Sequence, residues 1–212
     1  PDPQMVMRLR ELTRRGAHVI VVVPCQPMEG LIGFFTDYRP AVRDAVKKFY
    51  QMGHPAVGLM THDPLHLEHQ RAYLGYLDAH RELDLPIHPR GIVQETQYEA
   101  SGQTPDVKNI SAWICTFIGA VSIVAAECKR TGLSVPDDVS ILSLDDPGDA
   151  PMAALGKRLT VLRPDSAANA ARIHECLSNW REDRMGTLTP LPAVWIDRET
   201  IAPPNQRSSF EP

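Results

Sequence analysis

The segment from Gly132 to Asp146 constrains the fold of this chain more than any other stretch. Gly132 can adopt the left-handed conformation that closes a helix, and Pro136 prevents that helix from resuming. Residues 139–144 follow as a short apolar run rich in β-branched side chains, which is typical of a strand buried on both faces of a parallel sheet. The segment therefore predicts a helix end, a tight turn and a buried strand.

Two adjacent carboxylates, Asp145 and Asp146, stand directly after this strand. Open α/β sheets bind their ligands beyond the carboxyl ends of strands, so these acids are candidates for holding a hydroxylated or cationic ligand. The alternative is that one of them only caps the next turn. Because neighbouring side chains diverge, the two carboxylates are not expected to form a catalytic acid/base pair.

The bulk composition narrows the class of protein. The 212 residues are 43% hydrophobic and 23% charged, as in a soluble globular protein of one large domain or two small lobes. A net charge of -4 argues against nucleic-acid binding by this chain itself, because phosphate contacts need clustered Lys and Arg. No stretch has membrane-spanning length and no secretory signal opens the chain, so no membrane partner and a cytoplasmic location are expected.

The cysteines support the same location. There are four, with no C-x-x-C spacing, which favours buried thiols in a reducing compartment over disulfides; they are Cys25, Cys115, Cys128 and Cys176.

Predicted strands alternate with predicted helices along most of the chain. We expect helices at residues 3–16, 40–52, from about 70 through 79, 118–130 and 166–183. We expect strands at residues 18–23, 31–36, 56–60, 92–94, 112–115, 139–144, 159–162 and 193–197, with residues 95–109 and 147–157 mostly irregular. This alternation indicates right-handed βαβ units and a parallel sheet, hence an α/β fold.

Four short motifs, in order along the chain, resemble the effector-binding domain of the lactose-repressor/galactose-repressor (LacI/GalR) family of bacterial transcription regulators. The strongest is Gly-Leu-Ser-Val-Pro-Asp-Asp-Val-Ser at residues 132–140, followed by the strand that ends in the Asp pair. The others are Gln-Met-Gly-His at 51–54, Leu-Thr-Val at 159–161 and Arg-Glu-Thr-Ile-Ala-Pro-Pro at 198–204. Their order and spacing together extend the resemblance over nearly the whole chain.

The resemblance implies two Rossmann-like lobes of the type I periplasmic-binding-protein kind, with the effector held between them. Three crossovers are expected, near Asp37, Arg163 and Asp197. Residues 1–37 and 164–196 would form an incomplete N-terminal lobe, residues 38–163 and 197–204 the C-terminal lobe, and residues 205–212 a tail. A homodimer is also implied, with operator DNA bound only through a helix-turn-helix head that this chain does not contain.

Five residues are predicted to contact the effector. Asp145 is the first candidate, and Arg71 is the second because relatives place an arginine before a Gly-aromatic pair, here Gly75-Tyr76, although the spacing differs by one residue. His62 follows a strand end, and Phe117 and Ile118 occupy the positions where relatives have Asn-Asp.

The apolar replacements indicate a changed pocket. When a sugar site loses hydrogen-bonding partners, each sugar hydroxyl left unpaired weakens the binding free energy by roughly 1–3 kcal/mol. The effector would therefore differ from a simple sugar, unless the sensor has decayed or the missing groups belong to residues outside this chain.

A histidine-rich segment offers a metal site as an alternative. His62, His66 and His69 have the i, i+4, i+7 spacing of one helical face, and Asp63 and Glu68 lie among them. Pro64 would interrupt the helix between the first two histidines, so effector contact or a solvated helix start is favoured. No metal and no cofactor are predicted.

No enzyme is predicted, because the chain contains no G-x-S-x-G, no P-loop, no G-x-G-x-x-G and no H-E-x-x-H motif. The expected function is effector sensing in a transcription regulator. Two alternatives remain: an exported solute-binding protein of a transport system, and a degenerate module that only dimerises.

Overall fold

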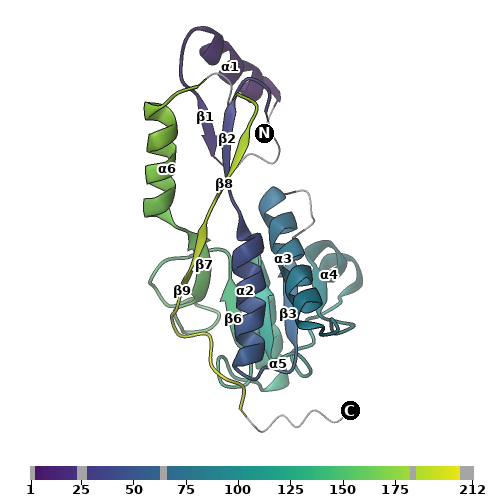
Figure 1. Cartoon of the computed structure of the whole chain (residues 1–212). Coiled ribbons are helices and arrows are strands. Elements are labelled where there is room, and N and C mark those ends of the chain that lie inside the picture. The colour runs from purple at the N-terminus through teal and green to yellow at the C-terminus, as the bar shows by residue number, and fades with distance from the viewer. Residues whose placement is uncertain (1–2, 23–27, 63–65, 182–184, 206–212) are drawn as a thin grey trace.

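The computed structural model describes residues 3–22, 28–62, 66–181 and 185–205. The chain forms two lobes of unequal size joined by a narrow waist (Figure 1). In the view of Figure 1 the small lobe lies above and the larger lobe below, and the chain passes repeatedly between them.

The larger lobe is built on a six-stranded sheet of order β4-β3-β5-β6-β7-β9. Its first five strands are parallel, and β9 is antiparallel to β7. The strands are β3 (Val57–Thr61), β4 (Ile92–Gln94), β5 (Ala112–Cys115), β6 (Ser140–Ser143), β7 (Thr160–Pro164) and β9 (Ala193–Ile196), and the helices are α2 (Tyr38–Gln51), α3 (Leu67–Leu83), α4 (Glu95–Ser101) and α5 (Ile118–Thr131).

Alternating side chains of the central strands divide the larger core into two layers, because successive residues of a strand point to opposite faces. Leu59, Ile114 and Leu142 pack with α2 and α3 on one face. Trp113 and Ile141 pack with α5 on the other. Strands β3, β5 and β6 are buried along their whole length, and for β6 this was predicted from the apolar run at residues 139–144.

Helices α2 and α3 approach closely because Gly75 lies at their contact. A Cβ at Gly75 would stand 2.2 Å from the backbone oxygen of Arg39, so no larger residue fits there. Asp37 caps α2 by accepting a hydrogen bond from the backbone N–H of Arg39, at 3.1 Å. The close contact between the helices thus explains the glycine of the Gly75-Tyr76 pair.

The small lobe has a three-stranded parallel sheet of order β1-β2-β8. Its elements are α1 (Pro3–Arg14), β1 (Ile20–Val22), β2 (Ile32–Thr36), α6 (Ser166–Ser178) and β8 (Leu188–Leu191). Ile32, Phe34, Cys176 and Leu191 form a buried cluster in this lobe, and α1 contains no buried residue.

Three segments cross the waist, and backbone hydrogen bonds tie them together. Asp37 joins β2 to α2, Asp165 joins β7 to α6, and Pro192 joins β8 to β9. The N–H of Asp37 donates to the carbonyl of Leu191 at 2.8 Å, and the N–H of Asp165 donates to the carbonyl of Pro192 at 3.1 Å. The crossing segments are thereby linked side by side.

The predicted α/β class with parallel sheets is confirmed, and Gly132 closes α5 with a φ of 75°. Three details differ. Strand β8 was not predicted, because Pro190 disguises a four-residue edge strand. Strand β9 pairs with β7 in the larger sheet, whereas residues 164–196 were assigned to the small lobe. Helix α4 occupies part of the region expected to be irregular.

The thiol prediction holds for the part of the chain that the structure describes. Cys115, Cys128 and Cys176 are free and buried, whereas Cys25 lies outside the described residues. Burial raises the pKa of the Cys128 thiol to about 12, so it stays protonated at neutral pH.

Candidate functional site

The carboxyl ends of both parallel sheets face the waist. Strand β2 runs directly into the crossover at Asp37, so its parallel neighbours β1 and β8 also end on that side. Strand β7 leaves the larger sheet for α6, so β3 to β6, which run parallel to it, end at the waist as well. Side chains that follow these strands are therefore the ones that can meet a ligand between the lobes.

The topological switch point of the larger sheet lies between β3 and β5. The chain moves from β3 outward to β4, and then returns to β5 and continues in the other direction. Ligands of open α/β sheets bind in the crevice that forms at this point. His62 directly follows β3 and Phe117 lies just after β5, so two predicted site residues stand at the switch point.

The rings of His62 and Phe117 stack there. Their centroids are 3.8 Å apart with an interplanar angle of 22°. His62 is also stacked with His69, at 5.2 Å, and its Nδ1 pairs with the carboxylate of Glu95 at the start of α4. His62 is thus held between an aromatic ring, a second imidazole and an acid.

Asp145 follows β6 on the same side of the sheet. Its side chain is exposed, and Oδ2 accepts a hydrogen bond from the backbone N–H of Ile118 at 2.8 Å. Asp145 therefore caps the start of α5, where the N-cap residue Phe117 offers no side-chain acceptor. Within the described ranges, Oδ1 of Asp145 makes no hydrogen bond.

Asp146 has a structural role instead. It accepts hydrogen bonds from Arg198 at 2.8 and 3.2 Å and from Arg163 at 3.1 Å. The hydrogen bond from Arg198 is the main cause that lowers the pKa of Asp146 to about 2. Both carboxylates of the pair are thus used locally, and Asp145 retains an oxygen for a ligand.

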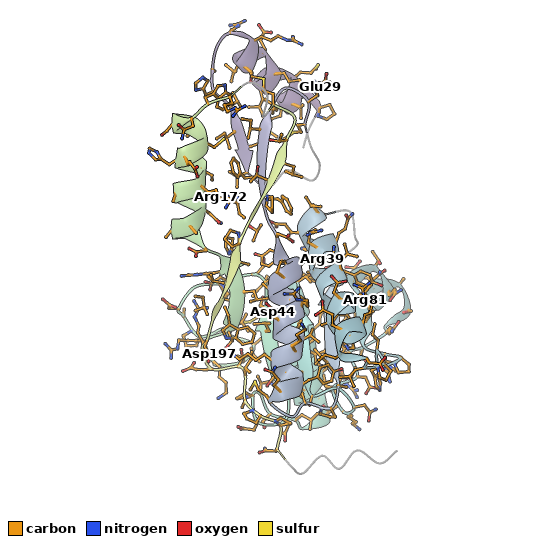
Figure 2. The ribbon with its side chains drawn as sticks, viewed as in Figure 1. Glu29, Arg39, Asp44, Arg81, Arg172 and Asp197 are labelled. Atoms are coloured by element: carbon orange, nitrogen blue, oxygen red, sulfur yellow. The ribbon has the colours of Figure 1, made fainter. Side chains whose placement is uncertain are left out.

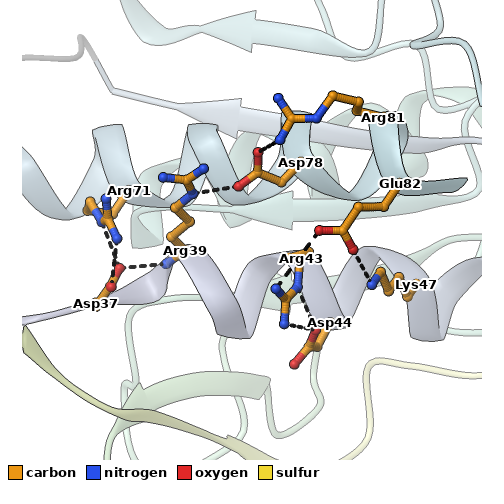
Figure 3. A network of polar contacts seen from close by, with 9 residues as sticks. All are labelled: Asp37, Arg39, Arg43, Asp44, Lys47, Arg71, Asp78, Arg81 and Glu82. Atoms are coloured by element: carbon orange, nitrogen blue, oxygen red, sulfur yellow. Dashed lines mark hydrogen bonds and ion pairs between the residues drawn. The ribbon is translucent and has the colours of Figure 1, made fainter. Parts of the chain in front are cut away.

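Arg71 was expected to reach into the cleft, but the structure pairs it with Asp37. Its Nε and Nη2 donate to the two carboxylate oxygens at 2.8 and 2.7 Å (Figure 3). Burial alone would raise the pKa of Asp37, but hydrogen bonds from Arg71 and the Arg39 backbone outweigh it and lower that pKa. This bidentate pair braces the first crossover against α3.

Further ion pairs extend along α2 and α3 from this point. Asp78 on α3 pairs with Arg39 and with Arg81, and Glu82 pairs with Lys47 (Figure 3). The first crossover is therefore attached to two helices that are themselves cross-linked by charge.

Residues outside the five predicted effector contacts also lie here, including Glu68 of the histidine-rich segment. Glu68 on α3 accepts hydrogen bonds from the backbone and hydroxyl of Thr36 at the end of β2, which links the lobes. Burial raises the pKa of Glu68 despite these bonds. Burial, followed by the charges of Glu68 and Asp145, also raises the pKa of Tyr38. Glu95 could have been predicted from the sequence, because it directly follows the strand expected at residues 92–94.

His69 is half-buried among these groups. Burial, together with His62 and His66, lowers the pKa of His69 to about 4, so its imidazole is neutral at pH 7. Its Nδ1 atom is buried and has no hydrogen-bond partner among the described residues.

The metal alternative finds no support in the described part of the chain. No group of three His, Cys, Asp or Glu side chains is arranged there to hold a metal ion. Asp63 and Pro64 lie outside the described residues. No described helix has the length and apolar character needed to cross a membrane.

A groove of about 400 Å³ crosses the waist and is lined from both lobes. Asp44 on α2 contributes from the larger lobe and Arg172 on α6 from the small one (Figure 2). The rest of the lining is formed by residues 190–193 of the third crossing segment and by Asp37, Pro40 and Ala41. Because its walls belong to different lobes, its width depends on the angle between them.

Two α/β lobes, joined by three hydrogen-bonded segments and with the carboxyl ends of their parallel strands facing each other, define a periplasmic-binding-protein-like domain. The chain belongs to the periplasmic binding protein-like domain family, whose sequence model matches residues 46–201. The resemblance to the LacI/GalR effector-binding domain, inferred from the motifs, is confirmed.

Solved structures of similar fold agree. A periplasmic binding protein/LacI transcriptional regulator from Alkaliphilus metalliredigens, in complex with D-xylulofuranose, is 19% identical with a TM-score of 0.67 and covers 94% of this chain and 84% of its own. A LacI-family sugar-binding regulator from Escherichia coli, in complex with phosphate, is 16% identical with a TM-score of 0.65, covering 94% and 74%.

The transcription regulator CcpA of Lactococcus lactis is 16% identical with a TM-score of 0.65, covering 90% of this chain and 72% of its own. At sequence identities this low, the similarity to these structures shows a shared fold. A search of curated protein sequences returned no match.

Proposed function

We propose that this chain is the effector-sensing and dimerising domain of a LacI/GalR-like bacterial transcription regulator. A small molecule would bind between the lobes and control DNA binding by a helix-turn-helix head upstream. This proposal places the protein in the cytoplasm and assigns it no catalytic step.

One observation carries the proposal: the side chains at the switch point of the larger sheet face a second set of strand ends across a three-segment waist. His62, Phe117 and Asp145 come from three neighbouring strand ends, and Thr36 meets Glu68 from the opposite lobe. A ligand that touches both sets of residues favours one angle between the lobes. Regulation needs such a preference, because a ligand with equal affinity for both arrangements of the lobes does not change their relative populations.

The roles of the five predicted residues then differ. We propose that Asp145 binds the effector through Oδ1, that His62, Phe117 and Ile118 form the wall beside it, and that Arg71 acts through Asp37. Ile118 is 38% exposed, so its side chain is accessible to a ligand. Arg71 is a positioning residue for the crossover in this scheme.

The test is a thermal-shift screen of sugars, sugar phosphates, nucleosides, amino acids and polyamines. At least one compound is expected to raise Tm, and Asp145→Ala is expected to weaken its binding at least tenfold by calorimetry. Because Asp145 also caps α5, this variant should lose about 1 kcal/mol of stability in the absence of compound. Asp137→Ala, at an exposed carboxylate outside the site, is the control.

If no compound raises Tm, or if Asp145→Ala binds the active compound as tightly as the parent protein does, the proposed function is wrong. In the full-length regulator, the same compound should change operator affinity.

A further inference from the structure

We infer that the groove across the waist is a second ligand site, which takes a small, flat apolar carboxylate and holds its charge with Arg172. This site differs from the strand-end site of the proposed function, and ligand binding in it does not depend on Asp145. The inference follows from the apolar lining of the groove and from an arginine that makes no ion pair with a described residue.

Most of the groove is lined by apolar groups. Pro40 and Ala41 contribute from α2, and residues 190–193 contribute the sequence Pro-Leu-Pro-Ala from the third crossing segment. The carbonyls of Leu191 and Pro192 already accept hydrogen bonds from backbone N–H groups of the other crossing segments. A volume of about 400 Å³ lies in the range of pockets that hold small molecules. The groove therefore suits a compact hydrocarbon body.

The two carboxylates in the lining are each paired with an arginine. Asp37 accepts hydrogen bonds from Arg71 at 2.8 and 2.7 Å, and its side chain is only 14% exposed. Asp44 pairs with Arg43, its neighbour on α2, at 2.9 Å. Because both acids are balanced in this way, neither gives the groove an uncompensated negative charge.

Arg172 on α6 differs from the other charged residues of the lining. Its guanidinium makes no hydrogen bond or ion pair with any residue that the structure describes. Arg172 also lines an adjoining cavity of about 360 Å³ between α6 and strands β2 and β8, and Glu175 lines that cavity but not the waist groove. An anion bound to Arg172 is therefore more stable on the side of the waist groove, away from Glu175.

The chemistry of the guanidinium then selects the ligand. Its N–H groups are donors only, and their planar arrangement matches the two oxygens of a carboxylate. A cation is repelled by Arg172, whereas a neutral ligand gains no charge-assisted hydrogen bond from it. With apolar walls beside this single charge, the groove is suited to a flat apolar body that carries one carboxylate.

A ligand in the groove also affects the arrangement of the lobes. The walls belong to both lobes, so a bound molecule stabilises the angle at which the two walls fit it. In the proposed function, such a ligand would change the affinity for the effector, and the effector would change the affinity for the carboxylate by the same factor. This coupling rests on the proposed function, whereas binding in the groove does not.

Three probes separate the contributions of ring and charge: benzoate has both, benzamide has the ring alone and acetate has the charge alone. Their affinities are measured by titrations followed in two-dimensional ¹H–¹⁵N NMR spectra. Benzoate is expected to bind with a Kd on the order of 1 mM, and benzamide and acetate roughly three- to tenfold more weakly. Benzoate should shift the amide signals of Ala41 and Leu191, one on each wall of the groove.

Arg172→Met tests the charge, because it keeps most of the side-chain length and removes the guanidinium. Benzoate affinity should fall roughly three- to tenfold, and benzamide affinity should change by less than about twofold. Arg8→Met is the matched control. It removes an exposed arginine of α1 that also makes no ion pair with a described residue, and both affinities should stay unchanged.

Ala41→Leu tests the apolar wall without altering any charge. The larger side chain fills part of the groove, so benzoate should bind at least about threefold more weakly, while acetate binding should be unaffected. The inference is overturned if benzoate does not bind, if benzamide or acetate binds as tightly as benzoate, or if Arg172→Met or Ala41→Leu binds benzoate like the parent protein.

The two sites are distinguished by Asp145→Ala, which alters only the strand-end site. This variant should bind benzoate like the parent protein. If it loses benzoate binding, benzoate occupies the strand-end site, and the groove is not the carboxylate site. That result would contradict the inference while supporting the proposed function. Conversely, benzoate binding that depends on Arg172 would support the inference even if the effector screen found no compound.

Discussion

The two lobes share one architecture, a parallel sheet with helices, but differ in how much apolar surface they bury. In the larger lobe, central strands β3, β5 and β6 are buried throughout, and helices pack on both faces. In the small lobe, β1 is only partly buried, Val22 is 52% exposed and α1 buries no residue. Since apolar burial is the main source of stability, the larger lobe is the rigid partner.

The strongest test of this contrast is a matched pair of leucine truncations. Leu142 is fully buried in β6, and Leu12 is 48% exposed on α1. Leu142→Ala should lower the free energy of unfolding by about 2–5 kcal/mol, because it opens a cavity between packed layers. Leu12→Ala should change it by no more than about 0.5 kcal/mol. Urea titrations followed by tryptophan fluorescence compare the two, and equal losses would abolish the distinction between the lobes.

Acid should act on the larger lobe through His54. Its ring is buried, with Nε2 3.0 Å from the carbonyl oxygen of Ala202 and Nδ1 2.9 Å from the hydroxyl oxygen of Ser111. Burial, partly offset by the bond to Ala202, lowers the pKa of His54 from 6.5 to about 4. The unfolded chain therefore takes up this proton first, and stability falls as pH drops from 6.5 towards 4.

The loss from His54 should be on the order of 2–3 kcal/mol over this interval. Urea titrations at a series of pH values should show it, and His54→Gln, although less stable at pH 7, should show a flatter pH dependence. An unchanged slope in His54→Gln would assign the acid sensitivity to other groups, such as His69 and His80.

A smaller effect is expected at the waist, where Arg71→Met leaves the mostly buried carboxylate of Asp37 unpaired. This variant should cost about 1–2 kcal/mol. Arg158→Met removes an exposed arginine that pairs with Glu199 at 3.2 Å, and it should cost no more than about 0.5 kcal/mol. Thermal unfolding of both variants at low and high salt gives the comparison. Equal, salt-sensitive losses would show that the pair at the crossover is no more important than one at the surface.

The sequence predicted the larger lobe well because local and tertiary signals agree there. The run at residues 139–144 is apolar because both faces of β6 are covered, and Gly132 ends α5 because a positive φ is needed. In the small lobe these signals conflict: Pro190 argues against a strand, yet β8 is an edge strand that tolerates it.

The site was predicted only in part, because position after a strand can be read from sequence and pairing cannot. His62, Phe117 and Asp145 were identified from strand ends, and they lie together. The partner of Arg71 is 34 residues away and was not evident from spacing. The sequence shows that Phe117 has no side-chain acceptor, but it does not show that Asp145, 27 residues from Ile118, caps α5 in its place.

The hydrogen bonds that join the crossing segments have a mechanical consequence. Three separate connections would allow the lobes to twist, slide and bend relative to each other, whereas segments bonded to one another at Leu191 and Pro192 restrict twisting and sliding and leave rotation about the waist as the easiest motion. The displacement produced by such a rotation grows with distance from the rotation axis. It is therefore greatest at the far end of the small lobe, where Figure 1 places α1. A rotation that displaces Asp37 by very little would therefore displace α1 by a much larger distance.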